Sequence, residues 1–328
     1  DHISKILELC RTHVFPAETS RECTGFVRLH LQYDDAGRVI VLPTPTRRRS
    51  ARRGNPPQPR INPDDIDIIS VRSTSNMNLS PQHPRFLSLK TRDDLVKAVA
   101  SGLVAPQGLI AQGRGEAFDY LIGERTMPTA SVATLAAVAL LLEAKSPVIS
   151  VNGNAAALAG KEIVNLASTV SASIEVNLFH RTLEREKLIA RHLKNFGAKE
   201  ILGVGSAASK TIGGISSPRA KVDPNGIGKA DVVLIPLEDG DRAQALENQG
   251  KRVIAIDLNP MSRTSQVASV TIVDNLVRAI PALIESSRKM KKLPQSQLEK
   301  YISSFNNERN LANAIEQIVQ YLQGWIKN

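Results

Sequence analysis

Short apolar runs alternate with amphipathic stretches over the second half of the chain. The apolar runs are rich in Val and Ile and have the length of strands, which predicts strands at 147–151, 173–177, 200–204, 231–236, 252–257 and 270–274. Apolar residues three or four positions apart predict helices between or after them, at 160–170, 182–195, 239–249 and 275–290. Apolar strands separated by helices indicate a parallel sheet that is covered on both faces.

The same helical spacing continues on either side of this alternating region. It predicts three helices before the first strand and two after the last, at 92–101, 115–123, 129–145, 296–304 and 308–326. The fold class expected for residues 77–328 is therefore α/β. It is a doubly wound, mostly parallel, Rossmann-like sheet with helices on both faces and helical N- and C-terminal flanks.

The first 76 residues have a different character. Alternation over 26–33 and 38–42, around Asp-Asp-Ala-Gly, indicates a β-hairpin, and residues 42–60 are rich in Pro and Arg, as a linker is. Met77 stands directly before the pattern of the α/β domain. We interpret 1–76 as a poorly structured, basic and proline-rich appendage, or as a product of an upstream start site, and 77–328 as the domain that carries the function.

Charge and composition narrow the classes of function. The chain holds 42 Lys and Arg against 32 Asp and Glu, a net charge of +10. The arginine run at 47–53 leaves a nucleic-acid role open, but the other basic residues are interspersed with acidic ones, which suits an enzyme that handles several phosphates. We expect no nucleic-acid partner.

Two further features bear on location and chemistry. No apolar stretch approaches the roughly 20 residues that cross a bilayer, so we expect no membrane association and a cytoplasmic protein. Both cysteines, Cys10 and Cys23, lie in the first segment, which excludes cysteine chemistry from 77–328. The histidines have no metal-ligand spacing, so no metal ligand is predicted.

Polar side chains follow five of the predicted strands. They are Asn152 and Asn154, Asn177, the acidic and basic residues of 238–242, those of 257–264, and Asp274 with Asn275. Ligands of parallel sheets bind outside the carboxyl ends of the strands, so these residues indicate a nucleotide or phosphate site. The alternative is that they only end strands and cap helices.

Three glycine-containing segments resemble phosphate loops. Gly113 and Gly115 flank Arg114 at the start of a predicted helix, where the backbone could approach an anion, although an ordinary loop entering a helix has the same pattern. Residues 203–208 nearly fit a dinucleotide fingerprint, but no helix follows, and 205–211 has Ser209 in place of the second glycine of a P-loop. An NAD-dependent oxidoreductase is an alternative function that is supported only by the predicted fold and by this near match.

At these same segments the sequence resembles the archaeal phosphopantothenate synthetases, also called 4-phosphopantoate–β-alanine ligases. The resemblance extends from about residue 83 to residue 285. The motifs that carry it are HPR at 83–85, APQGLIAQGRGEAFDYLIGE at 105–124, PVISVNGN at 147–154, IEVNLF at 174–179, IPLEDGDR at 235–242, IDLNPMSRT at 256–264 and TIVDN at 271–275.

The resemblance implies an ATP-dependent ligase of coenzyme A biosynthesis. Such an enzyme condenses 4-phosphopantoate with β-alanine and releases 4′-phosphopantothenate, AMP and diphosphate. The resemblance also implies Mg²⁺, bound with ATP as its cosubstrate complex, and a homodimer. The implied ATP contacts are Arg92, Arg114, Asp257, Leu258, Asn259, Arg263, Thr264, Asn275 and Leu276.

The sequence departs from the family at Gln112, where the family usually has histidine before Gly113 and Arg114. An amide can replace a histidine that positions substrate, but it cannot transfer a proton. A catalytically inactive nucleotide-binding protein of the same fold is therefore the alternative. For the substrate phosphate we expect Arg219, Lys221 or Arg242, and for its carboxylate or hydroxyl we expect Asn152 and Asn154.

Overall fold

The computed structural model describes residues 29–33, 39–43, 80, 82–83 and 85–327, in two compact units, Asp1–Arg72 and Ser73–Asn328. In the first unit β1 (Leu29–Tyr33) and β2 (Val39–Pro43) pair antiparallel. The predicted hairpin is therefore confirmed for its two strands. Its turn at 34–38 and the rest of the predicted linker, 44–60, lie outside the described residues.

The second unit is built on a sheet of five parallel strands: β3 (Pro147–Val151), β4 (Ser173–Val176), β7 (Val232–Pro236), β8 (Arg252–Ile256) and β9 (Val270–Ile272). Their order is β4-β3-β7-β8-β9. The first crossover runs to one side of β3 and the next connection returns to its other side. The topological switch point therefore lies between β3 and β7, and the predicted doubly wound sheet is confirmed.

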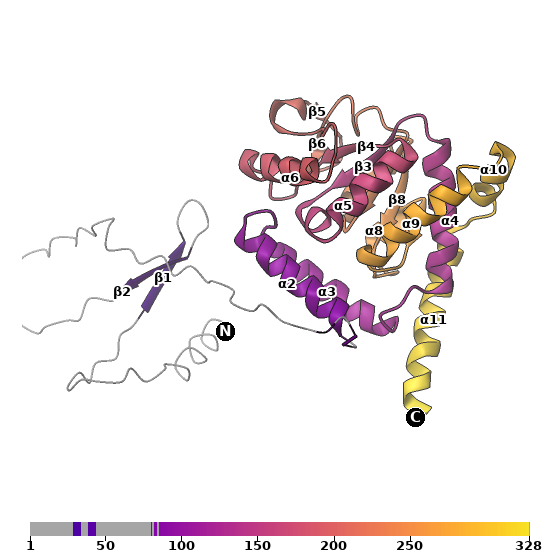
Figure 1. The fold of residues 1–328 in the computed structure, drawn as a ribbon, viewed down its shortest axis with the longest axis horizontal. Coiled ribbons are helices and arrows are strands. Elements are labelled where there is room, and N and C mark those ends of the chain that lie inside the picture. Colours follow the sequence, from indigo (N-terminus) through magenta and orange to yellow (C-terminus); the bar gives the residue numbers. More distant parts are fainter. Residues whose placement is uncertain (1–28, 34–38, 44–79, 81, 84, 328) are drawn as a thin grey trace, which may run out of the picture. The chain divides into compact units, whose positions relative to one another are not determined.

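One face of the sheet is covered by α4 (Pro128–Glu143), α5 (Gly153–Val170) and α9 (Leu276–Met290), which also pack against one another (Figure 1). The alanine-rich α4 is apolar on most sides. It is enclosed by α9 and β9 and by the C-terminal helices α10 (Gln295–Ser303) and α11 (Asn307–Lys327). This packing explains why its sequence lacks the polar face of a surface helix.

The other face carries a smaller core. Val148, Val233 and Val253, each the neighbour of a residue that enters the first core, point to this side, as the two-residue period of a strand requires. Among the described residues, α7 (Gly240–Glu247) is the longer helix that contributes to this core. The remainder is covered by irregular chain that includes the short pair β5 (Lys210–Thr211) and β6 (Lys221–Val222).

The prediction of a strand at 200–204 is wrong. The structure has a single parallel bridge there, between Glu175 and Leu202. Gly203 then takes a φ of +78°, and a Cβ at this position would lie 2.6 Å from the carbonyl oxygen of Val176. The chain therefore turns away from the sheet after one paired residue, and only glycine fits the turn.

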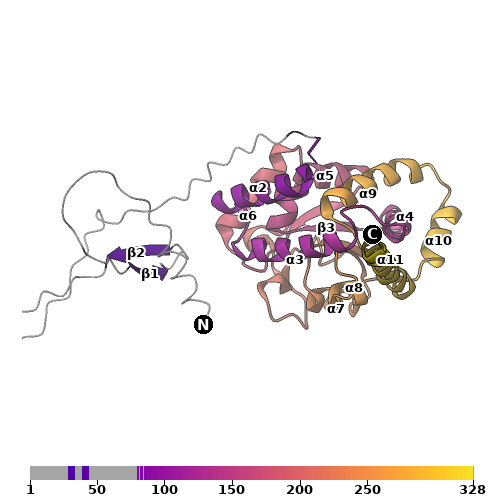
Figure 2. The same ribbon diagram turned by 90° about the horizontal axis from the view of Figure 1, so that it is seen from below.

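The N-terminal helices α2 (Phe86–Ala100) and α3 (Gln107–Leu121) lie side by side (Figures 1 and 2) and begin earlier than predicted. Gly113, Arg114 and Gly115 consequently lie inside α3 and not at its start, so that interpretation is wrong. Their backbone N–H groups belong to the helix. The segment is helical although glycine has a low helix propensity.

Two more helices complete the described fold. α6 (Leu183–Asn195) begins at Thr182, whose hydroxyl accepts a hydrogen bond from the Arg185 N–H at 3.3 Å. α8 (Arg263–Val267) is a short helix between β8 and β9. Within the described residues, no helix has both the length and the apolar composition needed to cross a membrane.

Candidate functional site

A cleft of about 700 Å³ lies at the carboxyl ends of the sheet strands. The segments that follow β3, β4, β7 and β8 line it, together with one side of α3. The cleft therefore includes the switch point between β3 and β7, where open parallel sheets bind their ligands.

The turn after β8 is held by side chains. The Asp257 carboxylate accepts hydrogen bonds from the Asn259 N–H at 2.9 Å and from the Ser262 hydroxyl at 2.5 Å. Ser262 in turn caps α8 by accepting from the Ser265 N–H at 3.0 Å. Burial raises the pKa of Asp257, while these two hydrogen bonds and the charge of Arg114 oppose that rise. The turn is therefore a rigid acceptor of ligand hydroxyl or amine groups.

Two arginines face this end of the cleft. Arg114 lines it from α3 and, among the residues that the structure describes, has no hydrogen-bond or ion-pair partner for its side chain. Arg263 pairs with Asp241, and the two side chains are 63% and 67% exposed. An exposed pair of this kind contributes little stability, so Arg263 can exchange Asp241 for a phosphate.

The loop after β7 carries a buried charge cluster. The Glu238 carboxylate pairs with Arg219 and, through its other oxygen, with Nη1 of Arg242 at 2.5 Å. Arg219 also lies 3.2 Å from Asp239, whose carboxylate borders the cleft and has a pKa raised by burial. The cluster joins the floor of the cleft to the end of β3, because Arg242 also donates to the Ser150 hydroxyl at 3.1 Å.

The two asparagines predicted to bind substrate, Asn152 and Asn154, form hydrogen bonds to backbone groups. Asn152 accepts from the Ala155 N–H and donates to the carbonyls of Pro236 and Leu237, each at 3.0 Å. Asn154 donates to the Gly108 carbonyl at 2.9 Å. Both line the cleft, so they fix its shape across the switch point.

The cleft brings together nine of the fourteen residues that the sequence analysis assigned to ATP or substrate: Arg114, Asn152, Asn154, Arg219, Asp257, Leu258, Asn259, Arg263 and Thr264. The structure places the other five elsewhere. Arg242 is buried beneath the floor, Lys221 lies exposed on β6, and Leu276 is a core residue at the start of α9. Contact between substrate and Lys221 or Arg242 is therefore not supported, because neither side chain lines the cleft.

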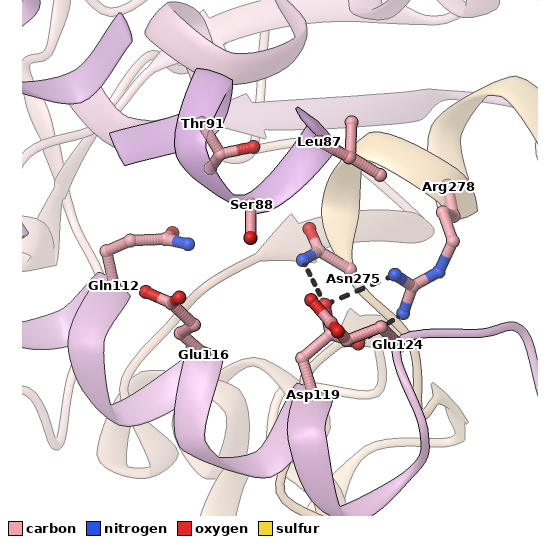
Figure 3. A pocket seen from close by; sticks show the side chains of 9 residues that line it. All are labelled: Leu87, Ser88, Thr91, Gln112, Glu116, Asp119, Glu124, Asn275 and Arg278. Atoms are coloured by element: carbon pink, nitrogen blue, oxygen red, sulfur yellow. Dashed lines mark hydrogen bonds and ion pairs between the residues drawn. The ribbon is translucent and has the colours of Figure 1, made fainter. Parts of the chain in front are cut away.

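Asn275 belongs to a second, smaller pocket of about 80 Å³ between α2, α3 and the start of α9 (Figure 3), and Arg92 pairs with Glu116, which lines this pocket. Asn275 lines this pocket and donates to Asp119 at 2.8 Å, while Arg92 beside it binds Glu116 with two nitrogens. Gln112 lines the same pocket. Since Arg114 lines the large cleft, α3 separates the family-departing Gln112 from that arginine.

Sequence reasoning missed the residues that close the other end of the cleft. Phe179, His180 and Arg185 line it, from the end of β4 and the first turn of α6. The position of these residues directly after a predicted strand was the signal that could have identified them.

The fold and cleft define a doubly wound α/β protein with a ligand site at the switch point of its sheet. The chain matches the phosphopantothenate/pantothenate synthetase family over residues 129–321. It is 49% identical over 240 residues to the 4-phosphopantoate–β-alanine ligase of Thermococcus kodakarensis, covering 73% of this chain and 91% of that protein. The enzyme of the same name from Methanosarcina mazei is 52% identical over 241 residues, which are 74% and 94% of the two chains. The chain belongs to the phosphopantothenate/pantothenate synthetase family.

Proposed function

We propose that the chain is an ATP-dependent 4-phosphopantoate–β-alanine ligase that releases 4′-phosphopantothenate, AMP and diphosphate. Its relatives at about 50% identity carry that name. The structural observation behind the proposal is the cleft at the switch point, with the Asp257–Asn259 turn and with Arg114, whose side chain has no partner among the described residues. Acceptors beside such a guanidinium suit a nucleotide.

The reaction joins a carboxylate to an amine, and a carboxylate has no good leaving group. ATP supplies one by forming an acyl-adenylate. Arg114 and Arg263 would neutralise the charge of the triphosphate and the charge that develops on it during adenylation. Asp257 and Asn259 would position the adenosine.

Arg92, Asn275 and Leu276, the remaining expected ATP contacts, lie outside the cleft; Asn275 and Leu276 are also buried, so we retain only Arg92 in the proposal. In the structure Arg92 pairs with Glu116, and its side chain is 46% exposed. A pair this accessible can be exchanged for a phosphate when the nucleotide binds. Mg²⁺ would arrive with ATP as its cosubstrate complex. The described residues include no cluster of His, Cys, Asp and Glu arranged to hold a metal ion by itself.

The second half of the reaction needs a neutral amine, because an ammonium group has no lone pair to attack the adenylate. Asp239 borders the cleft, and burial raises its pKa above the ordinary carboxyl value, which makes it a better proton acceptor. We assign it the proton of the β-alanine ammonium. Holding the amine beside the mixed anhydride then makes the attack effectively unimolecular.

Two features of organisation complete the proposal. The ligase domain is residues 77–328, with 1–76 as an appendage. The active form is a homodimer, and exposed apolar side chains on α11 support association: Val319 is 45%, Trp325 71% and Ile326 84% exposed. Apolar surface of this extent on one helix favours a protein contact.

The test is direct product formation by the full chain. Purified protein is incubated with ATP, magnesium, 4-phosphopantoate and β-alanine, and AMP and 4′-phosphopantothenate are followed by mass, with each substrate omitted in turn. The ligase gives AMP that depends on 4-phosphopantoate and product that depends on β-alanine. Tight ATP binding without AMP release would instead identify the inactive nucleotide-binding protein.

A further inference from the structure

The cleft has two ends that are built by different parts of the sheet. The turn after β8, with Arg114 above it, forms the end that we assign to the nucleotide. The opposite end is formed by the start of α5, the end of β4 and the first turn of α6. β3 and β7 separate β4 from β8, so three strand spacings put the two ends roughly 14 Å apart. A second ligand therefore fits beside the nucleotide.

Arg185 provides the positive charge of this second end. Its Nη1 donates to the His180 carbonyl, and its Nη2 lies 3.5 Å from the Leu103 carbonyl oxygen. The buried Nε has no partner, and within the described part of the chain Arg185 forms no ion pair. Burial lowers its pKa, with no acidic neighbour to oppose that effect. A half-buried guanidinium without an anion is costly, and a bound anion would offset that cost.

Two other arginines lie near this end, and each already has an acidic partner. Arg219 and Arg242 share the carboxylate of Glu238, and Lys221 does not line the cleft. Within the described residues, Arg185 is therefore the arginine lining this end that has no acidic partner.

The start of α5 is shaped around the same guanidinium. A Cβ on Gly153 would lie 3.2 Å from Nη2 of Arg185 and 2.6 Å from the Leu103 carbonyl oxygen. Glycine is thus the residue that lets the first turn of this 18-residue helix approach Arg185 so closely. The partial positive charge of the helix N-terminus adds to that of the guanidinium.

We propose that Arg185 binds the phosphate group of the phosphorylated hydroxy acid and thereby sets the preference of the enzyme for the phosphorylated over the unphosphorylated acid. The inference rests on the proposed function. A phosphate monoester is a dianion with three acceptor oxygens, so it can pair with guanidinium hydrogens that the His180 and Leu103 carbonyls leave free. The carboxylate of β-alanine is the competing occupant, with one charge and two oxygens.

The experiment compares the full-length protein with Arg185→Gln, Arg185→Lys and the control Arg191→Gln, which removes an exposed arginine from the same helix. Calorimetry measures the binding of 4-phosphopantoate and of pantoate, and steady-state kinetics gives the KM of each substrate. Arg185→Gln should weaken 4-phosphopantoate roughly 10- to 100-fold and leave pantoate and ATP unchanged. Arg185→Lys should recover part of the loss, and Arg191→Gln should match the wild type.

Three results would overturn the inference: equal losses for pantoate and 4-phosphopantoate, no loss for either, or a raised KM for β-alanine alone. Inorganic phosphate keeps the test separate from the ligase reaction. Its protection of the wild type against thermal unfolding should disappear in Arg185→Gln, even if no AMP is formed. A wild type without turnover but with this protection contradicts only the proposed function, whereas protection that is equal in both proteins, or absent from both, contradicts the assignment of Arg185.

Discussion

Glu238 and Arg242 form an ion pair from which solvent is excluded, with side chains that are 2% and 1% exposed. Arg219 takes the other oxygen of the same carboxylate. One carboxylate therefore pairs with two guanidinium groups at the floor of the cleft. Its removal would leave Arg242 without an ion-pair partner in a place that water does not reach.

Glu238→Gln should consequently lower the free energy of unfolding by about 3–5 kcal/mol, the usual cost of breaking one side of a buried pair. Urea denaturation followed by circular dichroism measures this change. Glu316→Gln, which alters an exposed acid on α11, is the control and should change the stability by less than about 0.5 kcal/mol. Equal effects of the two substitutions would show that Arg242 does not depend on its partner.

Glu175 gives the stability a dependence on pH. Its buried carboxylate accepts from the N–H groups of Asp223 at 3.0 Å and Ile227 at 2.6 Å, and burial raises its pKa to about 7. The folded protein thus holds this proton more tightly than the unfolded chain, whose glutamate has the ordinary value of 4.5. Below the lower value both states are protonated. The free energy of unfolding should therefore fall as pH rises from about 4.5 through 7, by a contribution on the order of 3 kcal/mol.

Glu175→Gln cannot ionise, so its unfolding free energy should lack this contribution and fall less between about pH 5 and pH 8 than that of the wild type. Denaturation curves at several pH values give both slopes. The lost acceptor of the glutamine lowers stability at every pH, and the comparison of slopes removes that offset. Identical slopes would mean that Glu175 titrates at its ordinary value.

The sequence predicted most of the sheet because its strands are apolar on both sides and are followed by polar turns. It failed at 200–204, where one glycine with a positive φ turns the chain after an apolar run that otherwise looks like a strand. Periodicity does not register the backbone geometry of a single residue. The same limit applied to α3, which is helical through a segment with two glycines.

The sequence could predict those site residues that directly follow a strand. Asp257, Asn259 and Arg263 follow a recognisable strand and do line the cleft. Arg242 looked equally suitable, but it lies one helical turn after Glu238 and points inward to pair with it. Arg185 looked like a surface residue because its neighbours are charged. Which way a charged side chain points depends on tertiary contacts that the local pattern does not contain.

Arg114→Gln should raise the KM for ATP roughly 10- to 100-fold. The substitution removes a charged donor that lines the cleft, has no partner among the described residues and is therefore left to bind the nucleotide. The binding of 4-phosphopantoate in the absence of ATP should not change. Calorimetry and initial-rate kinetics measure the two quantities, with Arg191→Gln as the control. An effect of equal size on both ligands would argue for a general distortion of α3.

Asp239→Asn should slow amide formation about 100-fold and preserve adenylation, since the assigned role is to take the proton of the attacking amine. Adenylation is followed as the exchange of labelled diphosphate into ATP without β-alanine. A rise in pH should partly restore the rate of the variant, because more of the amine is then neutral. If exchange falls as far as amide formation, Asp239 acts before the amine enters.

The separation of the cleft into two ends places its two recognition tasks in different stretches of the chain. Residues 152–185 supply the wall with Arg185, and residues 237–264 supply the turn and the short helix on the other side, with Arg114 of α3 above that turn. A change of acid specificity can therefore accumulate in the first stretch while the second stays as it is. A protein with this fold can thus evolve to activate a different acid and still use ATP to do so.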